Sequence, residues 1–321
     1  MDNAEVVEYS KLVHSNPTHQ ETIVVNWCLG NTCNFSCTYC PEDLHNAKRP
    51  WPSLETAVNF INKVRKVHQN KNIYVELTGG EVTLWKDLIQ FSDYCRLNNV
   101  KIGIISNGSR SLDFWEKLIP KIDHVCLSFH AEKGNADHYF EVVKMASQTI
   151  RTHTNFMMHT EHFNKVLELA FRIKDIPNIS MAVQPLVVDF GDKLYKYTPT
   201  QLKVIDQQHE MLVKHIKYDK NFEYYRGAMD MVNSEGNHKR ISPQRLISLG
   251  ANNWKDWQCY AGVEQLIVNM DGEILRGWCS VGGKLGHISD EKLELPTAPV
   301  LCNKTFCHCN FDIMSTKVKH A

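Results

Sequence analysis

The chain has 321 residues, which is enough for one α/β barrel domain with a small appended domain. Lysine plus arginine and aspartate plus glutamate both number 36, so the composition provides no global attraction to nucleic acid or to an anionic membrane. The N-terminus lacks the apolar segment of a secretory signal, and no apolar run is long enough to span a bilayer. We therefore expect a cytoplasmic protein with no nucleic-acid partner and no membrane segment.

Short apolar or β-branched runs alternate with amphipathic helical patterns from residue 22 to about residue 217. This alternation is typical of βα units around a parallel sheet. Strands are expected at Thr22–Cys28, Ile73–Leu77, Lys101–Ile105, His124–Phe129, Asn155–Met158 and Ile179–Val183. Helices are expected to begin after an N-cap at Ser53 and near Leu84, Leu112, Asp137, Asn164 and Thr200. Six units are too few for a closed eight-stranded barrel, so the predicted fold class is α/β, a partial (β/α)6 TIM barrel.

The pattern changes after residue 217, which predicts a division of the chain into four segments. Residues 1–21 form an N-terminal extension, 22–217 the barrel core, 218–249 a connection and 250–321 a small C-terminal domain. Within the last segment, two β-rich runs about Asp271-Gly272 predict a hairpin.

Eleven cysteines are distributed in two clusters and a few single positions. In a reducing cytosol, such clusters favour metal ligands over a disulfide framework. Cys95 and Cys126 lie in apolar runs and are interpreted as small buried hydrophobic residues.

The first cluster is the stretch CNFSCTYC, which follows the first expected strand and places Cys33, Cys37 and Cys40 in one loop. The C-terminal ends of barrel strands are where barrel active sites are built. A structural zinc site uses four ligands, whereas this loop offers three. A [4Fe-4S] cluster held by three thiolates has one iron with an open coordination position, where a cofactor can bind.

This C-x3-C-x2-C pattern, with aromatic Tyr39 before the last cysteine, resembles the signature of the radical S-adenosylmethionine (SAM) superfamily. The resemblance implies a [4Fe-4S] cluster on the three cysteines and SAM bound at the open iron. It also implies a one-electron reductant such as flavodoxin or ferredoxin. Reductive cleavage of SAM would then give a 5′-deoxyadenosyl radical that abstracts hydrogen from a substrate.

Other residues match the family by position. Gly79-Gly80-Glu81, after the second expected strand, resembles the segment that receives the SAM amino group, although Val82 stands where the family often has proline. Gly79-Gly80 alone is also compatible with a simple βα turn. The resemblance implies further SAM contacts at Tyr39, Ser106, Asn107, Ser128 and Gln184. For the two serines and the asparagine, the alternative is that they only form turns.

His130 stands beside Glu132 at the end of the fourth expected strand. It is a weak candidate for a catalytic acid or base. The alternative is a hydrogen-bonded histidine at a strand end, and the sequence identifies no partner that would decide between the two.

The second cluster resembles the SPASM/twitch extension, in which a hairpin and trailing cysteines hold an auxiliary [4Fe-4S] cluster. Five cysteines are present and four ligands are needed. The expected ligands are Cys259, Cys279, Cys307 and Cys309, with Cys302 as the alternate. A zinc ion bound by four of these cysteines is the alternative, because tetrahedral sulfur sites suit either metal.

The predicted function is a radical SAM oxidoreductase with two [4Fe-4S] clusters that modifies a peptide substrate oxidatively. The auxiliary cluster would accept the electron left on the substrate. Alternatives are the same chemistry on a sugar, an aminocyclitol or another small molecule, an electron carrier, and a zinc-stabilised binding module without catalysis.

Overall fold

The computed structural model describes residues 8–16, 18, 21–188, 193–214, 229–307 and 309–319. Contacts divide the chain into two compact units. We call Leu29–Leu54 with Glu76–Glu223 the central unit, and Met1–Cys28, Glu55–Val75 and Tyr224–Ala321 the terminal unit.

Six strands, each followed by a helix, form the barrel part of the chain. The strands are β2 (Thr22–Cys28), β3 (Asn72–Thr78), β4 (Val100–Ser106), β5 (His124–Phe129), β6 (Arg151–Met158) and β7 (Ile179–Pro185). The helices are α1 (Leu54–Val67), α2 (Leu88–Leu97), α3 (Leu112–Leu118), α4 (Ala136–Ser147), α5 (Phe163–Ile173) and α6 (Pro199–Lys214). The strand order does not close on itself, because β7 ends it. The prediction of a partial (β/α)6 barrel is confirmed.

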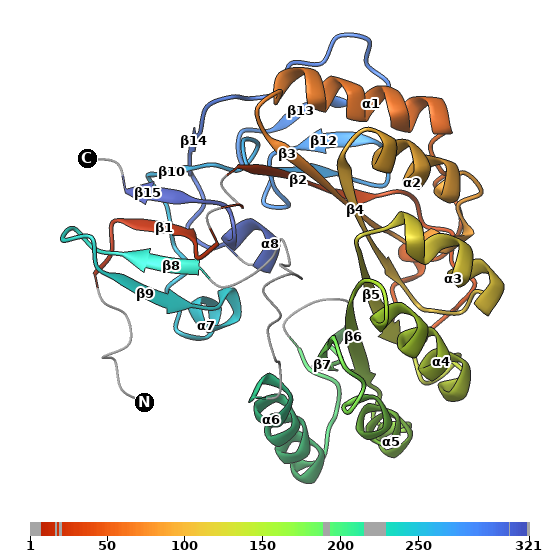
Figure 1. The fold of residues 1–321 in the computed structure, drawn as a ribbon. Coiled ribbons are helices and arrows are strands. Elements are labelled where there is room, and N and C mark those ends of the chain that lie inside the picture. The colour runs from red at the N-terminus through yellow and green to blue at the C-terminus, as the bar shows by residue number, and fades with distance from the viewer. Residues whose placement is uncertain are drawn as a thin grey trace. The chain divides into compact units, whose positions relative to one another are not determined.

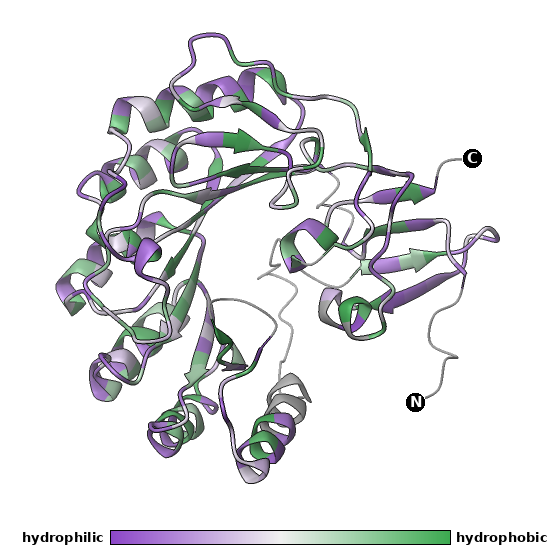
Figure 2. Cartoon of the chain, turned by 180° about the vertical axis from the view of Figure 1, so that it is seen from behind, coloured by the Kyte–Doolittle hydropathy of each residue, from purple (hydrophilic) through white to green (hydrophobic). Residues whose placement is uncertain are grey.

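In the central unit, β4 to β7 are parallel, and helices α2 to α5 lie along one face of them (Figure 1). Hydrophobic and hydrophilic residues share each of these helices (Figure 2). In α5, the buried residues Phe163, Val166, Ala170 and Ile173 recur at helical spacing.

β6 shows how the sheet presents its second face. Its alternate residues Thr152, Thr154, Phe156 and Met158 are buried, and the residues between them are partly exposed. Since side chains alternate across a strand, Asn155 and Met157 point to the opposite face from this buried set.

The terminal unit contains a six-stranded sheet in the order β14-β10-β15-β1-β8-β9. Its strands are β14 (Val300–Leu301), β10 (Trp257–Cys259), β15 (Lys317–Lys319), β1 (Lys11–His14), β8 (Met229–Val232) and β9 (His238–Ile241). Helices α7 (Pro243–Ser248) and α8 (Asn310–Ile313) also belong to this unit.

The predicted hairpin is also in the terminal unit. Strand β11 (Gln265–Val268) pairs with β2 in parallel and with β12 (Glu273–Leu275) antiparallel, and β12 continues to β13 (Lys284–His287). Gly272 has φ +77°, a left-handed conformation that glycine adopts readily, and its N–H donates to the Asn269 carbonyl. The hairpin prediction is confirmed.

Three details differ from the sequence analysis. The helix expected near Leu84 is a single 3₁₀ turn, Val82–Leu84, because the Glu81 side chain caps it by accepting from the Thr83 N–H; α2 begins only at Leu88. β6 begins at Arg151, four residues earlier than predicted, since polar and buried residues alternate there. The predicted N-terminal extension and connection contain β1, β8, β9 and α7, which the sequence pattern did not predict. Residues 1–7 and 218–228 of those segments lie outside the described residues, and the boundaries between the four segments stay predictions.

Candidate active site

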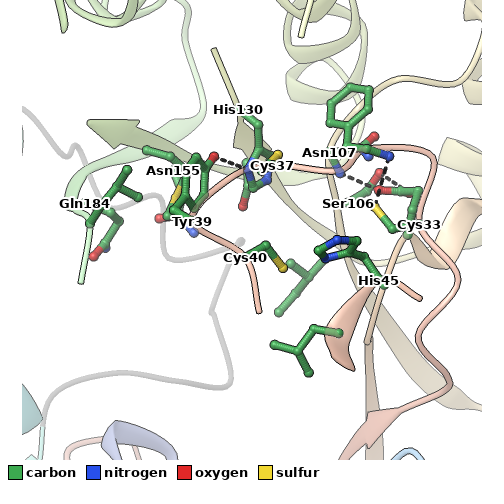
Figure 3. Close-up of a pocket in the computed structure, with 18 of the residues that line it drawn as sticks. Cys33, Cys37, Tyr39, Cys40, His45, Ser106, Asn107, His130, Asn155 and Gln184 are labelled. Carbon is green, nitrogen blue, oxygen red and sulfur yellow. Dashed lines mark hydrogen bonds between the residues drawn. The ribbon is translucent and has the colours of Figure 1, made fainter. Parts of the chain in front are cut away.

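The largest group of sequence-predicted site residues meets in one pocket of the central unit, with a cavity of about 490 Å³ (Figure 3). This volume is within the usual range for small-molecule sites. The pocket lies at the C-terminal ends of the barrel strands. Its lining includes Cys33, Cys37, Tyr39, Cys40, Gly79, Gly80, Glu81, Ser106, Asn107, Ser128, His130 and Gln184.

The cysteine loop is anchored to the Gly79-Gly80 segment through the backbone. The Gly80 N–H donates to the Gly30 carbonyl (2.9 Å), and the Glu81 N–H donates to the Thr32 carbonyl (2.8 Å). A Cβ on Gly80 would lie 2.2 Å from the Thr32 oxygen, and one on Gly79 would lie 2.4 Å from the Gly30 oxygen. Glycine is required here because the two backbones approach more closely than any side chain allows.

Glu81 connects three loops through a carboxylate that is 1% exposed. Its Oε1 accepts from the Thr83 N–H (3.1 Å), the Thr83 hydroxyl (2.5 Å) and the Ser106 hydroxyl (2.7 Å), and its Oε2 accepts from the Asn107 N–H (2.7 Å). Burial raises the pKa of Glu81 above its ordinary value, although the bonds from Asn107, Thr83 and Ser106 oppose this shift. The carboxylate therefore has a loop-fixing role, and its predicted contact with SAM stays a prediction.

Asn107 and Asn34 join the end of β4 to the first cysteine. The Asn107 side chain donates to the Asn34 side-chain oxygen (3.0 Å), and the Asn34 amide donates to the Ser109 hydroxyl (2.8 Å). The Phe35 N–H donates to the Cys33 sulfur (3.3 Å). The Cys33 sulfur thus accepts a backbone hydrogen bond, and the next residue, Asn34, is tied to the end of β4.

The middle of the cysteine loop is fixed by Glu132, a residue that the sequence analysis mentioned only as a neighbour of His130. The Glu132 carboxylate accepts from the Thr38 N–H (2.8 Å) and the Thr38 hydroxyl (2.5 Å). His159 Nε2 lies 3.2 Å from Glu132 Oε1. Although its burial acts in the opposite direction, the bonds from Thr38 and the nearby His159 lower the pKa of Glu132, so it is ionised at neutral pH.

His130 contacts Tyr39, which is the aromatic residue of the cysteine motif (Figure 3). The Tyr39 hydroxyl is 2.6 Å from His130 Nδ1, and the two rings are nearly parallel, with 5.9 Å between centroids. Burial raises the pKa of Tyr39 and lowers that of His130 to about 4, so both are neutral at pH 7. The hydroxyl therefore donates and Nδ1 accepts, which supports the hydrogen-bonded alternative for His130.

The three thiols of the loop share one environment. Burial is the largest cause of the raised pKa of each, and the pKa of Cys37 reaches about 12, with further increases from Glu132, Cys33 and Cys40. Across the described ranges, no three His, Cys, Asp or Glu side chains already stand at metal-ligand spacing. Three neighbouring soft sulfur donors nevertheless suit an iron-sulfur cluster, whose positive iron would stabilise the thiolates.

The remaining wall of the pocket is neutral. It includes Ser128, Asn155, Met157, Gln184 and Leu186. Of these residues, the sequence analysis named only Ser128 and Gln184 as site residues. Asn155 and Met157 face the pocket because buried and partly exposed residues alternate along β6, and this alternation is clear only when β6 is known to begin at Arg151.

The Radical SAM superfamily model matches residues 27–173, which includes the cysteine loop, Gly79-Gly80-Glu81 and His130. This part of the chain is a radical SAM domain. The prediction of a radical SAM domain is confirmed for these residues, and the whole protein's activity is considered below as a proposal.

Two curated relatives match short segments. The S-adenosylmethionine-dependent nucleotide dehydratase of Fibrobacter sp. (strain UWH6) is 26% identical over 94 residues, which is 28% of each chain. The GTP 3',8-cyclase of Haemophilus influenzae (strain 86-028NP) is 28% identical over 103 residues, 32% of this chain and 30% of that protein. The matched segments therefore cover less than a third of the length of each of these relatives.

Solved structures resemble a larger part of the chain. The structure described as native anSMEcpe with bound AdoMet has a TM-score of 0.51 and 18% identity, covering 84% of this chain and 78% of that one. Streptococcus suis SuiB bound to S-adenosylmethionine has a TM-score of 0.53 and 15% identity, covering 85% and 64%. At these identities the likeness shows the fold. Within the described ranges, no helix is both long and apolar enough to cross a bilayer.

The C-terminal cysteines lie outside the matched radical SAM domain, in the terminal unit. Cys259, Cys279 and Cys302 pack together with Ala261 and Val281 in one apolar cluster. The backbone explains this: β10 ends at Cys259 and pairs with β14, and the Cys302 N–H donates to the Trp257 carbonyl (2.8 Å). The structure thus brings the alternate ligand, Cys302, beside two of the expected ones.

Cys307 and Cys309 have different surroundings. Cys307 is buried; burial is the main cause of its raised pKa, and Cys279 and Cys259 are among the neighbours that raise it further. Cys309 instead packs against the cluster that contains Phe311 and Trp278. Cys307 thus lies in the buried cluster that contains Trp254 and Ile313, apart from the cluster of Cys259, Cys279 and Cys302, although Cys259 and Cys279 are near enough to raise the pKa of its thiol.

Asp312 fixes the loop that carries Cys279. Its carboxylate accepts from the N–H of Cys279 (2.7 Å) and of Trp278 (3.0 Å), and from the Gln265 side chain (3.1 Å). The residue is 2% exposed, so these bonds satisfy a buried carboxyl group. The sequence analysis did not include Asp312 in the site.

Proposed function

We propose that the chain is a radical SAM oxidoreductase that cleaves SAM in the central-unit pocket and oxidises a peptide substrate. The observation that carries this proposal is that Cys33, Cys37 and Cys40 line one pocket with Gly79, Gly80, Glu81, Ser106 and Asn107. When a [4Fe-4S] cluster is bound there, it would supply one electron to SAM and so generate the 5′-deoxyadenosyl radical.

The chain's own residues hold the cysteine loop in place for this step. Glu132 bonds the backbone and side chain of Thr38, between two of the ligands, while Gly79 and Gly80 let the base of the loop pack closely. Tyr39, held by His130, presents a ring at the pocket wall. A preorganised loop loses little entropy when it binds a cofactor, which favours affinity.

Gln184, Asn155 and Ser128 offer neutral donors and acceptors for SAM or for substrate. Met157 and Leu186 add apolar contacts from β6 and the end of β7. Side-chain amides pair with peptide groups without a charge penalty, so this wall suits a peptide segment. The solved structure of SuiB with its precursor peptide, which shares the fold at 15% identity, agrees with this substrate class.

An auxiliary [4Fe-4S] cluster in the terminal unit would accept the electron left on the substrate after hydrogen abstraction and loss of a proton. We propose Cys259, Cys279, Cys302 and Cys307 as its ligands, in place of the set with Cys309, because the first three pack in one cluster and Cys259 and Cys279 are near enough to act on the Cys307 thiol. Zinc at the same four sulfurs is the alternative.

A second candidate function is the same radical chemistry on a nucleotide or another small molecule. It is favoured by the two sequence relatives, a nucleotide dehydratase and a GTP cyclase. The two candidates share every step up to the radical and differ only in the molecule that the neutral wall receives.

Anaerobically reconstituted protein tests the proposal. Wild type with dithionite and SAM should release 5′-deoxyadenosine. The variant with alanine at Cys33, Cys37 and Cys40 should release none but should retain about four irons in the terminal unit. Undiminished release from that variant would contradict the assignment. Retention of zinc in place of iron would contradict the auxiliary cluster alone.

A further inference from the structure

Lys317 is the most deeply buried cation that the structure describes, with 1% of its surface exposed. It lies in β15, directly opposite Cys259 of β10 in an antiparallel pair. Directly opposite residues project to the same face, with Cβ atoms about 4.5–5.5 Å apart. The lysine side chain therefore leaves the sheet on the same side as a proposed cluster ligand.

The ammonium group occupies a site built to hold a charge. Nζ donates to the backbone carbonyls of Asp312 (2.8 Å), Ile313 (3.1 Å) and Ser315 (2.8 Å). A lysine ammonium has three N–H donors, so all of them are satisfied. Two of these carbonyls belong to α8 at its C-terminal end, where a positive charge is favoured.

The same ammonium lies 4.7 Å from the centroid of the Trp254 ring. Trp254 and Cys307 belong to one buried apolar cluster, which also contains Ile313 and Met314. The cation is thus flanked by Cys259 across the strand pair and by the cluster that holds Cys307. Its charge also acts to lower the pKa of both thiols.

Capping a helix of four residues stabilises the protein too little to offset the cost of burying a lysine. The desolvation of a charge costs several kcal/mol, and backbone carbonyls compensate for only part of it. Asp312, the nearest buried carboxylate on the same element, already has three N–H donors of its own. The buried carboxyl group of Glu264 also interacts with Lys317, but it is shared with Lys71. Four thiolates around an iron-sulfur cluster would supply further negative charge on the side of Lys317 where Cys259 lies.

We propose that Lys317 is the fixed counter-charge of the auxiliary cluster and sets its reduction potential. This inference rests on the proposed function, because it assumes a cluster on Cys259, Cys279, Cys302 and Cys307. A buried positive charge stabilises the more negative, reduced cluster. It therefore favours uptake of the single electron that the oxidised substrate gives up. Lys317 acts as a tuning residue that does not touch the substrate.

The test is a redox titration monitored by electron paramagnetic resonance on variants in the Cys33/Cys37/Cys40→Ala background, so that the signal comes from the auxiliary cluster alone. Lys317→Gln removes the charge but can still donate to the carbonyls. It should lower the equilibrium constant for electron uptake at least tenfold, a shift of about 59 mV to more negative potential. Lys317→Arg keeps the charge and should stay close to wild type.

Lys319→Met is the matched control, because Lys319 is two residues along the same strand and its side chain is half exposed. Its removal should leave the potential unchanged. If Lys317→Gln holds iron at the wild-type potential, the inference is overturned. If Gln abolishes iron binding in a folded protein while Arg retains it, the need for the charge is supported; if both abolish it, Lys317 is a helix cap only and the inference is wrong. If the background variant itself holds no iron, the auxiliary cluster of the proposed function fails first.

Discussion

Replacement of Glu81 by alanine should affect both stability and SAM binding. The carboxylate is 1% exposed and accepts four hydrogen bonds, so Glu81→Ala leaves four donors without their partner. The hydroxyls of Thr83 and Ser106 can rotate to other acceptors, whereas the backbone N–H groups of Thr83 and Asn107 are fixed. Each buried unsatisfied N–H costs about 1–3 kcal/mol, so the two together should lower the free energy of unfolding by roughly 2–6 kcal/mol.

The same change should weaken SAM binding. If the free lone pair of Glu81 Oε2 receives the SAM amino group, its loss costs about 1.5–3 kcal/mol, or roughly a 10- to 150-fold higher Kd. Urea unfolding followed by tryptophan fluorescence gives the first quantity, and isothermal titration of SAM into reconstituted protein gives the second.

Two controls make the result interpretable. Ser106→Ala removes one donor to Glu81 and also the acceptor of the Gly108 N–H (3.1 Å), and should cost about 1–3 kcal/mol of stability. Glu116→Ala removes an exposed carboxylate of α3 and should change stability by less than about 0.5 kcal/mol. If Glu81→Ala is as stable as Glu116→Ala, the loop-fixing role is wrong. If stability falls but SAM affinity does not, Glu81 is structural and does not contact SAM.

The other predictions concern the two cysteine sites and the pH dependence of stability. Gly80→Ala places a Cβ 2.2 Å from the Thr32 oxygen, which should prevent the cysteine loop from holding its cluster and lower the total iron content to about half or less. Gly236→Ala, whose Cβ meets nothing within 4 Å, should keep the full iron content. Equal iron content in both variants would refute the packing argument. Cys302→Ala should lose about four irons and Cys309→Ala none, as counted by mass spectrometry, and the reverse result would restore the ligand set with Cys309. His68, which is buried in α1's C-terminal turn region, has its pKa lowered to about 4, mainly by burial and then by Lys71, so the folded state binds fewer protons than the unfolded state. Its contribution is complete above pH 6.5 and is lost as the pH falls toward 4. Between pH 7 and pH 5 wild type should therefore lose about 2 kcal/mol more stability than His68→Leu, in which His130 still contributes; parallel pH profiles in urea unfolding would contradict this.

The sequence predicted the barrel well because its signals are local. The strands Thr22–Cys28 and His124–Phe129 match residue for residue, since each is an apolar run bounded by polar residues. The start of α2 was misplaced because one side chain, Glu81, caps a separate 3₁₀ turn before it. Such a turn has no periodicity from which it could be predicted.

The contacts that fix the site depend on distant partners. Thr38 and Glu132 are 94 residues apart, and only the parallel order of the strands brings their loops together. In the same way, spacing alone could not show that Cys302 lies beside Cys259, because this proximity depends on β14 pairing with β10. The role of Lys317 was also invisible, because a lysine near the end of a chain is ordinarily exposed.

The central claim, that Cys33, Cys37 and Cys40 hold a cluster with one iron open to SAM, is tested most directly by electron paramagnetic resonance of the reduced cluster with and without SAM. The Cys259→Ala/Cys279→Ala variant should be used, because it removes two proposed auxiliary ligands and isolates the signal of the cysteine loop. The spectrum should change when SAM is added, because SAM would bind the iron itself. A full cluster signal that is identical with and without saturating SAM would contradict the claim.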